Sequence, residues 1–377
     1  MRVLIAPDSY KGTLTSVEVA QALAEGWRQA RPDDDVLLAP LADGGEGTLV
    51  AIEAAGGWWR RETAVRDPLG RPVLARWLVR KDGGAAVIEM ATASGLSRLA
   101  AKERDAVRAT SAGTGDLLRA ALDAGIRDVV LGIGGSATTD GGAGLLAALG
   151  ASVGEDLARV DLAGLDPRLA ELRLRVACDV TNPLLGPDGA AAVYGPQKGA
   201  GPAMVELLDA RLARWADALE AATGRSERLT PGAGAAGGVG FGLLCLAGRF
   251  ASLELRPGIN LVMEAAGFDE ALATAALVLT GEGRIDAQTA FGKTALGVAR
   301  RAGAAGVPCI AVGGGVTLEG VEALAVVGAR AVGASDPPLP LAEAIAAGVA
   351  PLIACAERLA RGVTVSLADD SLAREVG

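Results

Sequence analysis

Short apolar runs alternate with helical spacing at both ends of the chain. The run at 3–6 predicts a buried strand, and apolar positions between residues 17 and 27 recur with the period of one helix face. Thr15 and Glu18 have the spacing of a capping box, which predicts where this helix begins. The remaining elements expected at the two ends are strands at 36–41, 275–280, 309–312 and 331–334 and helices at 46–55, 294–303, 318–325 and 341–360.

The middle of the chain follows another pattern. Apolar runs at 61–65, 73–79 and 85–90 are separated by the turn sequences DPLG and DGG, which predicts an antiparallel meander. Alternation with helices then resumes, with helices expected at 114–124 and 142–149 and strands at 129–133 and 174–178.

These patterns predict an α/β fold. Two opening strands and three closing strands make a doubly wound parallel sheet, and the middle of the chain is an inserted, mixed α/β domain. We expect one domain at 1–64 and 245–377 and the inserted domain at 65–244, with the active site in the cleft between them.

Composition and charge narrow the function. The chain has 377 residues, a length that favours two domains and leaves a third open, and half of the residues are hydrophobic. No apolar run has the length of a membrane span, and the opening run is too short for a signal peptide, so we expect a cytoplasmic protein without membrane contact. The net charge of −9 argues against a nucleic-acid partner.

The chain contains no histidine. That excludes Ser-His-Asp triads and HExxH zinc sites, so any proton transfer falls to Asp, Glu, Lys or Tyr. The four cysteines are scattered without metal spacing and are expected to be reduced core thiols. A metal, if one is used, is therefore a hard cation such as magnesium.

Only five of the 36 basic residues are lysines, and three of the five adjoin a glycine: Lys11, Lys198 and Lys293. A lysine offers a compact point charge that suits a phosphate or carboxylate oxygen. Because glycine is abundant in this chain, chance adjacency remains the alternative.

Five polar loops follow apolar strands, and each carries a carboxylate: DSYKG (8–12), ADGGEGT (42–48), GIGGSATTDGGAG (132–144), CDVTNP (178–183) and TGEGRID (280–286). In open α/β sheets this edge is where ligands bind, and glycine lets backbone N–H groups approach an oxyanion. No loop is a Walker A or Rossmann fingerprint. A single such loop can be a tight turn, but the set indicates a polyanionic ligand handled with a metal.

Further segments share this character: DPLGRP, IEMATASGL, ACDVTNPLLGPDGAAAVYGPQKGA, GAGAAGGVGFG and TGEGRIDAQTAFGK. With the loops above, in order along nearly the whole chain, they resemble the bacterial glycerate kinase family of the type without a MOFRL-type domain. The resemblance implies a flavodoxin-like domain from both chain ends with an inserted domain. It also implies ATP-dependent phosphorylation of D-glycerate with Mg²⁺, and it favours 2-phosphoglycerate as the product.

Phosphoryl transfer needs positioning, cations and an acceptor for the hydroxyl proton. Because histidine is absent, the base is expected to be a carboxylate, with Asp179 as the first choice and Asp140 as the second. Lys11 is the third catalytic candidate. Asp140 and Asp286 are the candidate metal ligands.

The candidates for binding substrate or phosphate lie mostly in the same loops. They are Asp8, Ser9, Asp43, Gly44, Gly45, Glu46, Ser94, Gly134, Gly135, Ser136, Thr138, Thr139, Gly141, Gly142, Asn182, Lys198, Glu282, Arg284 and Lys293. Lys198, Arg284 and Lys293, together with Lys11, are expected to neutralise phosphates and the glycerate carboxylate.

Alternatives remain at this point. The chain could phosphorylate another small hydroxy acid or polyol, or it could be a two-domain anion-binding protein without chemistry. Arg284 could form a loop ion pair with a neighbouring acid, and Asp179 could cap the turn that follows it. Nucleotide preference and oligomeric state are not visible in the sequence.

Overall fold

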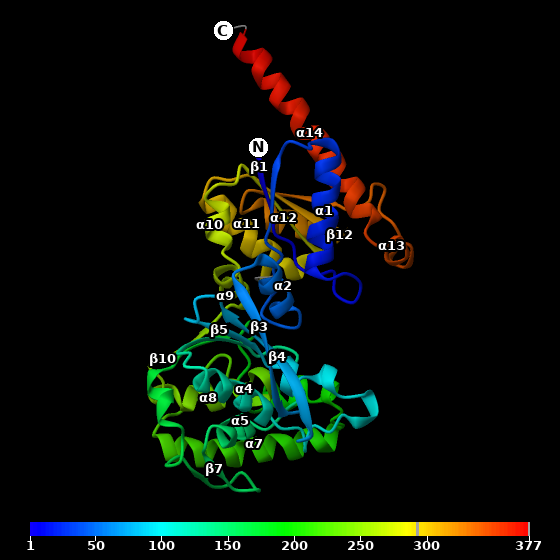
Figure 1. Ribbon diagram of the computed structural model, residues 1–377. Coiled ribbons are helices and arrows are strands. Elements are labelled where there is room, and N and C mark those ends of the chain that lie inside the picture. The colour runs from blue at the N-terminus through cyan, green and yellow to red at the C-terminus, as the bar shows by residue number, and fades with distance from the viewer. Residues whose placement is uncertain (292–293, 376–377) are drawn as a thin grey trace. The chain divides into compact units, whose positions relative to one another are not determined.

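The computed structural model describes residues 1–291 and 294–375 of the chain, and the chain divides into two compact units. Unit 1 comprises Met1–Asp43, Val50–Gly56 and Val262–Gly377, and unit 2 comprises Gly44–Leu49 and Gly57–Leu261 (Figure 1). Apart from the short exchange at 44–49, the chain passes between the units at residues 56/57 and 261/262, whereas the sequence pattern placed the boundaries at 64/65 and 244/245.

Unit 1 is built on a five-stranded parallel sheet of β1 (Arg2–Ile5), β2 (Asp35–Leu38), β11 (Leu277–Ile285), β12 (Cys309–Val316) and β13 (Ala329–Gly333). The order β13-β12-β11-β1-β2 is that of a flavodoxin-like sheet. β1 pairs with β11 in the register Val3↔Leu277, which joins the two ends of the chain.

The helices of unit 1 are α1 (Ser16–Ala30), α10 (Phe268–Leu272), α11 (Thr294–Ala304), α12 (Leu318–Ala325), α13 (Leu341–Ala347) and α14 (Ala350–Glu375), with a 3-10 turn at Ala287–Phe291. The capping box predicted for α1 is confirmed, because Thr15 and Glu18 bond reciprocally. Gly26 of α1 lies against the backbone of Ile353 in α14, where a Cβ would come within 2.0 Å of the carbonyl oxygen. The two helices thereby cover one face of the sheet together.

Unit 2 has a six-stranded mixed sheet of β3 (Trp58–Arg66), β4 (Pro72–Arg80), β5 (Ala86–Glu89), β6 (Asp128–Gly132), β9 (Arg173–Ala177) and β10 (Ser252–Arg256). Its order is β10-β9-β6-β5-β4-β3. The strands β3, β4 and β5 form the predicted antiparallel meander, whereas β5, β6, β9 and β10 run parallel. The sheet is therefore mixed, as the sequence pattern predicted.

The helices of unit 2 are α3 (Ala91–Ser94), α4 (Ala112–Asp123), α5 (Ala143–Ala148), α6 (Ala190–Tyr194), α7 (Pro202–Thr223) and α8 (Ala235–Cys245). A small ribbon of β7 (Ser152–Val153) and β8 (Val160–Asp161) and 3-10 turns at Leu96–Arg98, Ala101–Glu103, Pro167–Glu171, Pro196–Lys198 and Ala247–Arg249 complete it. Two helices, α2 (Thr48–Ala55) and α9 (Gly258–Ala265), contain residues of both units. Trp215 and Phe241 are fully buried in the core of unit 2.

Two expectations about elements were wrong, and one strand was not predicted. Residues 281–285 were expected in a loop, but β11 runs on to Ile285 because β12 also runs on and pairs with it, Glu282 opposite Gly313 and Arg284 opposite Gly315. The single helix expected at 341–360 is two helices, α13 and α14. β10 was not predicted, since its sequence SLELR alternates polar residues along a sheet edge.

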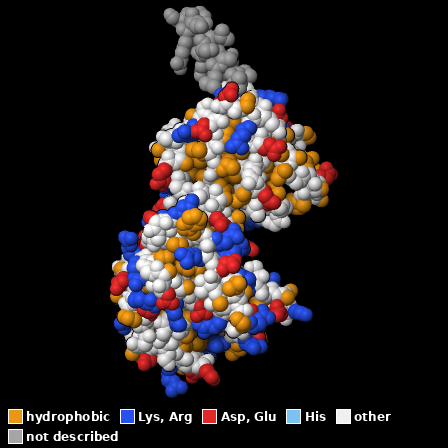
Figure 2. Space-filling view, in the orientation of Figure 1, with side chains coloured by type: hydrophobic (Ala, Val, Ile, Leu, Met, Phe, Trp, Pro, Cys, Tyr) orange, Lys and Arg blue, Asp and Glu red, His pale blue; other side chains and the backbone are white. Residues whose placement is uncertain are grey.

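The four cysteines are free thiols, three of them buried and Cys178 half-buried. Among the described residues, no helix is both long and apolar enough to cross a membrane. Figure 2 shows acidic and basic side chains interspersed on the visible face of each unit, so charge of one sign is not gathered there into a single patch.

Candidate active site

Four parallel strands of unit 2 end side by side at one edge of its sheet. The register places Glu89 of β5 beside Gly132 of β6, Gly132 beside Ala177 of β9, and Ala177 beside Arg256 of β10. The loops that follow β6 and β9 are two of the five polar loops. The sheet therefore brings the segment from Gly132 and the segment from Cys178 to the same edge, which is where ligands bind in sheets of this kind.

The segment 44–49, which comprises most of the polar loop 42–48 and the beginning of α2, packs against this edge. A Cβ on Gly134 would come within 2.7 Å of Gly45 Cα, and one on Gly44 within 2.7 Å of Ala177 Cβ. Only glycine allows the backbones to approach this closely. The candidates Gly44, Gly45 and Gly134 are thus brought together by backbone packing within unit 2.

Lys198 is the buried cation of this region. Its side chain is 1% exposed, and Nζ donates to Thr138 O at 2.6 Å and to Ser136 Oγ at 3.1 Å. Both partners are neutral. Burial lowers the pKa of Lys198 to about 7, while the charge of Asp140 opposes the shift. The ammonium group thus lies against the glycine- and hydroxyl-rich loop, where its hydrogen-bond partners are neutral oxygens.

Asp140 is held by four donors. Its Oδ2 accepts from Ser111 N at 2.8 Å, Ser111 Oγ at 2.9 Å and Gly144 N at 3.1 Å, and its Oδ1 accepts from Gly142 N at 3.1 Å. These donors lie at the beginnings of α4 and α5, where backbone N–H groups lack partners within the helix. The carboxylate therefore ties the loop to two helices.

The other hydroxyl candidates divide into partnered and unpartnered groups. Thr138 Oγ1 donates to Ala236 O at 3.4 Å, and Ser94 Oγ accepts from Thr114 N and Oγ1 at 3.2 and 3.0 Å. Thr139 Oγ1 is buried and has no hydrogen-bond partner among the described residues. A buried hydroxyl without a partner is costly, and such groups are few in native proteins.

Asp179 follows β9 and is exposed. Its Oδ1 accepts from Gly258 N at 2.9 Å, so the carboxylate lies at the beginning of α9. The helix dipole stabilises a negative charge there. Asn182 is engaged within its own loop, because Oδ1 accepts from Tyr194 Oη at 2.6 Å and Nδ2 donates to Asp188 O at 2.8 Å.

Glu89 was not predicted from the sequence. It is the last residue of β5, it is 4% exposed, and it accepts from Gly47 N at 3.2 Å and Leu49 N at 3.3 Å. Burial raises its pKa to about 7, the two backbone bonds oppose the shift, and Glu46 adds to it. The signal that could have found it is an acid ending an apolar strand, in the segment IEMATASGL.

Unit 1 gathers a second group of candidates. Asp8 is 6% exposed, and its carboxylate accepts from Ser9 N at 2.6 Å and Thr294 Oγ1 at 2.5 Å. Burial raises the pKa of Asp8, an effect that the Thr294 bond opposes and the charge of Asp43 increases. Glu282 is also buried and accepts from Thr289 Oγ1 at 2.7 Å.

The cations of unit 1 lie nearer to solvent. Lys11 Nζ pairs with Asp43 Oδ2 at 2.9 Å, and the lysine side chain is 76% exposed. Arg284 Nε lies 3.3 Å from Asp286 Oδ2, which is the ion pair considered above as the alternative for Arg284. Asp286 Oδ1 accepts from Gln288 N at 2.9 Å. Lys293 lies outside the described residues.

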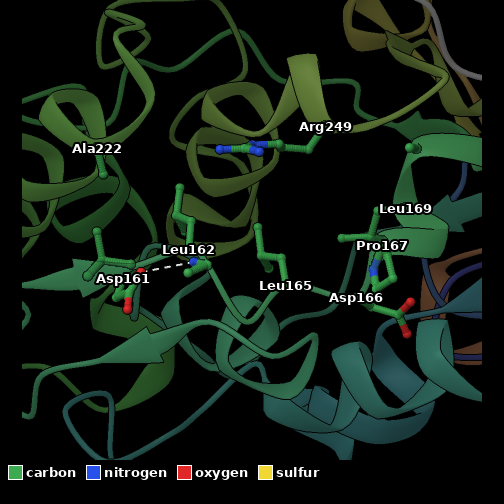
Figure 3. Close-up of a pocket in the computed structure, with 11 residues that line it drawn as sticks. Asp161, Leu162, Leu165, Asp166, Pro167, Leu169, Ala222 and Arg249 are labelled. Carbon is green, nitrogen blue, oxygen red and sulfur yellow. Dashed lines mark hydrogen bonds between the residues drawn. The ribbon is translucent and has the colours of Figure 1, made fainter.

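A pocket of about 630 Å³ occurs elsewhere in unit 2, lined by β8, the segment that follows it, Ala222 and Arg249 (Figure 3). Figure 3 shows Arg249 across the pocket from Leu162 and Leu165. Its acids are engaged, Asp166 with Arg168 and Asp161 with the backbone of Ala163. No candidate residue lines this pocket, so we place the site at the strand ends.

Comparison with known proteins decides the family. A family model described as "Glycerate kinase family" matches residues 3–364. The chain belongs to the glycerate kinase family. It is accordingly an enzyme of the kinase type, a transferase that phosphorylates an alcohol group. This membership counts against the alternative of a binding protein without chemistry.

Relatives in the glycerate kinase family cover most of the chain. "Glycerate kinase" of Bacillus subtilis and "Glycerate 2-kinase" of Escherichia coli K12 are each 45% identical over 331 residues, which is 84% of this chain and 86% of each relative. A crystal structure of a glycerate kinase 2 candidate from Salmonella typhimurium LT2 superposes with a TM-score of 0.84 at 41% identity. It covers 97% of this chain and 99% of that one.

Proposed function

We propose that this glycerate kinase family member transfers the γ-phosphoryl group of ATP to D-glycerate, with the 2-hydroxyl as the favoured acceptor. The names of the relatives support glycerate as the substrate, and the name "Glycerate 2-kinase" supports the 2-position. The observation in the fold that carries the proposal is the buried ammonium group of Lys198, which contacts Ser136 and Thr138 of the loop 132–144.

A buried ammonium that meets only neutral oxygens is destabilised, which is why its pKa falls to about 7. An anion bound at the loop would restore the charged form, because electrostatic attraction is strong in a medium of low dielectric constant. Ser136 and the unpartnered Thr139 hydroxyl would add hydrogen bonds to such an anion. We therefore assign this region to the negative charge of the glycerate carboxylate or of the transferred phosphoryl group.

Asp179 is the proposed proton acceptor. Its carboxylate is exposed at the end of a rigid strand, which suits a group that meets a substrate hydroxyl. Asp140 is the second choice and is disfavoured by its four donors, because a base in that position would have to give up bonds that hold two helices. With no histidine in the chain, a carboxylate is the natural base for this reaction.

Magnesium is proposed as the metal. The residues present fit an ion that is held by one or two carboxylates and takes its other ligands from water and the substrate phosphates. Among the described residues, no three Asp, Glu or Cys side chains gather into a metal cage. Magnesium commonly takes one or two carboxylates and otherwise uses water and substrate phosphates. Asp286 in unit 1 and Asp140 in unit 2 are each proposed, separately, as such a carboxylate. The four donors that hold Asp140 make Asp286 the better candidate. When bound, the ion neutralises charge on the phosphates.

The group in unit 1 is proposed to serve the phosphates of ATP. Lys11 is exposed and its partner Asp43 is only partly buried, so this pair can open at small cost. The freed ammonium would then offer three donors to phosphate oxygens. Asp8 and Ser9 belong to the same loop and are proposed to hold it in shape through the bond to Thr294.

The test is an ADP-release assay on the purified protein with ATP and a panel of acceptors. We expect rapid release with D-glycerate, and little with L-glycerate, D-lactate, glycolate or glycerol. Release that is equally fast without any acceptor, or that is specific for another member of the panel, would overturn the substrate assignment. The variant Glu206→Gln, changed at an exposed position of α7, is the control for differences between protein preparations and should release ADP as the parent protein does.

A further inference from the structure

The carboxyl group of Glu89 joins two parts of unit 2 that lie 40 residues or more apart in sequence. It ends β5, and its two oxygens accept from the N–H groups of Gly47 and Leu49, one oxygen each. Gly47 has a φ of +95°, a left-handed conformation that glycine adopts without strain. This turn directs two N–H groups of one short segment to a single carboxyl group.

The same segment carries three of the predicted binding residues. Gly44 and Gly45 pack against the ends of β9 and the segment after β6, and Glu46 is exposed between them and Gly47. The three glycines of the segment offer no side chain to hold it, and its packed side chains are Thr48 and Leu49, which are buried at the beginning of α2. The backbone bonds to Glu89 are therefore a principal restraint on the place of Glu46 in unit 2.

We propose that Glu89 is a positioning residue for the reaction, whose buried carboxyl group fastens residues 44–49 to the end of β5 and so fixes the part of the site that Gly45 and Glu46 form. The inference rests on the proposed function for the role of the segment in catalysis. That Glu89 fastens the segment is inferred from its hydrogen bonds with Gly47 N and Leu49 N, from the burial of its carboxyl group and from the left-handed turn at Gly47.

The fastening depends on pH in a defined direction. The charged groups that act on Glu89 are Glu46 from the segment itself and Arg76 from β4. While the segment is fastened and Glu89 is buried, the pKa of its carboxyl group is about 7. When the segment is released and the carboxyl group is hydrated, the pKa returns to its ordinary value of 4.5. Protonation therefore favours the fastened segment, and ionisation favours its release into water. From pH 6 to pH 8 the opening equilibrium should rise about tenfold.

Two variants and a control test the proposal. Glu89→Ala leaves two buried N–H groups without an acceptor, so KM for D-glycerate or ATP should rise about tenfold or more while kcat changes much less. Glu89→Gln keeps one acceptor and the same shape, so it should recover part of that loss. Glu206→Ala and Glu206→Gln, on an exposed position of α7, should leave both constants unchanged.

Hydrogen exchange of the peptide containing residues 44–49 gives a readout that needs no substrate. In the parent protein, protection corrected for the intrinsic exchange rate should fall about tenfold from pH 6 to pH 8. In Glu89→Gln it should not change with pH. Equal pH dependence in the two proteins, or unchanged KM in Glu89→Ala, would overturn the proposal. If D-glycerate is not phosphorylated at all, the substrate assignment fails, and the exchange experiment still decides the fastening.

Discussion

Replacing Lys198 by methionine should leave the protein as stable as before, or more stable, slightly below neutral pH, and should lower its activity there. Methionine fills a similar volume and removes the ammonium group. Lys198 has a pKa of about 7 when folded, against an ordinary value of 10.5. Because this pKa is lowered, Lys198 does not destabilise the folded protein above pH 10.5. As the pH falls from 10.5 to about 7, the free energy of unfolding decreases, since the unfolded chain takes up the proton first. The difference corresponds to about 5 kcal/mol.

The variant escapes this loss but gives up the bonds to Ser136 Oγ and Thr138 O. Such bonds contribute roughly 1–3 kcal/mol each. The urea midpoint of Lys198→Met should therefore be lower than that of the parent protein at about pH 10, and equal or higher at about pH 6. Because the variant lacks the charge that we assign to anion binding, kcat/KM should fall by about 10² or more up to about pH 7. The difference should narrow at higher pH, where Lys198 of the free parent protein loses its proton.

The measurement is a series of urea transitions at several pH values, beside kcat/KM from ADP release. Lys102→Met, at an exposed position, is the matched control and should follow the parent protein in both. If the curves of midpoint against pH for Lys198→Met and the parent protein are parallel, Lys198 does not titrate as a buried cation. Full activity in Lys198→Met would remove it from the site.

Three other changes test separate parts of the account. Asp179→Asn keeps the acceptor for Gly258 N, so the fold should persist while kcat falls about 10² and KM for D-glycerate changes less; a near-normal kcat would remove Asp179 from the base role. In Asp140→Asn the amide N–H group faces backbone N–H groups that need an acceptor, so the thermal midpoint should fall by an amount equivalent to about 2–3 kcal/mol. An unchanged midpoint would show that the Asp140 carboxylate does not tie the loop to α4 and α5. Excess EDTA should abolish turnover and added magnesium should restore it, whereas full activity in the chelator would exclude a metal-dependent reaction.

The sequence predicted most of the fold because buried parallel strands leave clear apolar runs. The runs that became β1, β6 and β9 were placed within a residue or two of their ends. Prediction failed where pairing rather than local sequence decides the structure. In β11, glycines 281 and 283 read as a loop, yet pairing with the equally glycine-rich end of β12 extends both strands.

The candidate site was predictable only in part, for a related reason. Lys198 stood out as one of the few lysines of the chain and as one that adjoins a glycine, and its burial agrees with a special role. Glu89 gave no such signal, because its two partners lie about 40 residues away in sequence and are backbone N–H groups. Sequence patterns also gave no means of telling that the Asp140 carboxylate is occupied by donors from two helices.

The most direct test of the central claim is a phosphorus NMR spectrum of the products formed from ATP, magnesium and D-glycerate by the purified protein. We predict signals of ADP and a new phosphomonoester that is split into a doublet, because the phosphate on carbon 2 couples to a single proton. A triplet would show phosphorylation at the 3-hydroxyl and would contradict the assigned acceptor. A spectrum with unchanged ATP, or with inorganic phosphate as the only new signal, would contradict phosphoryl transfer to D-glycerate.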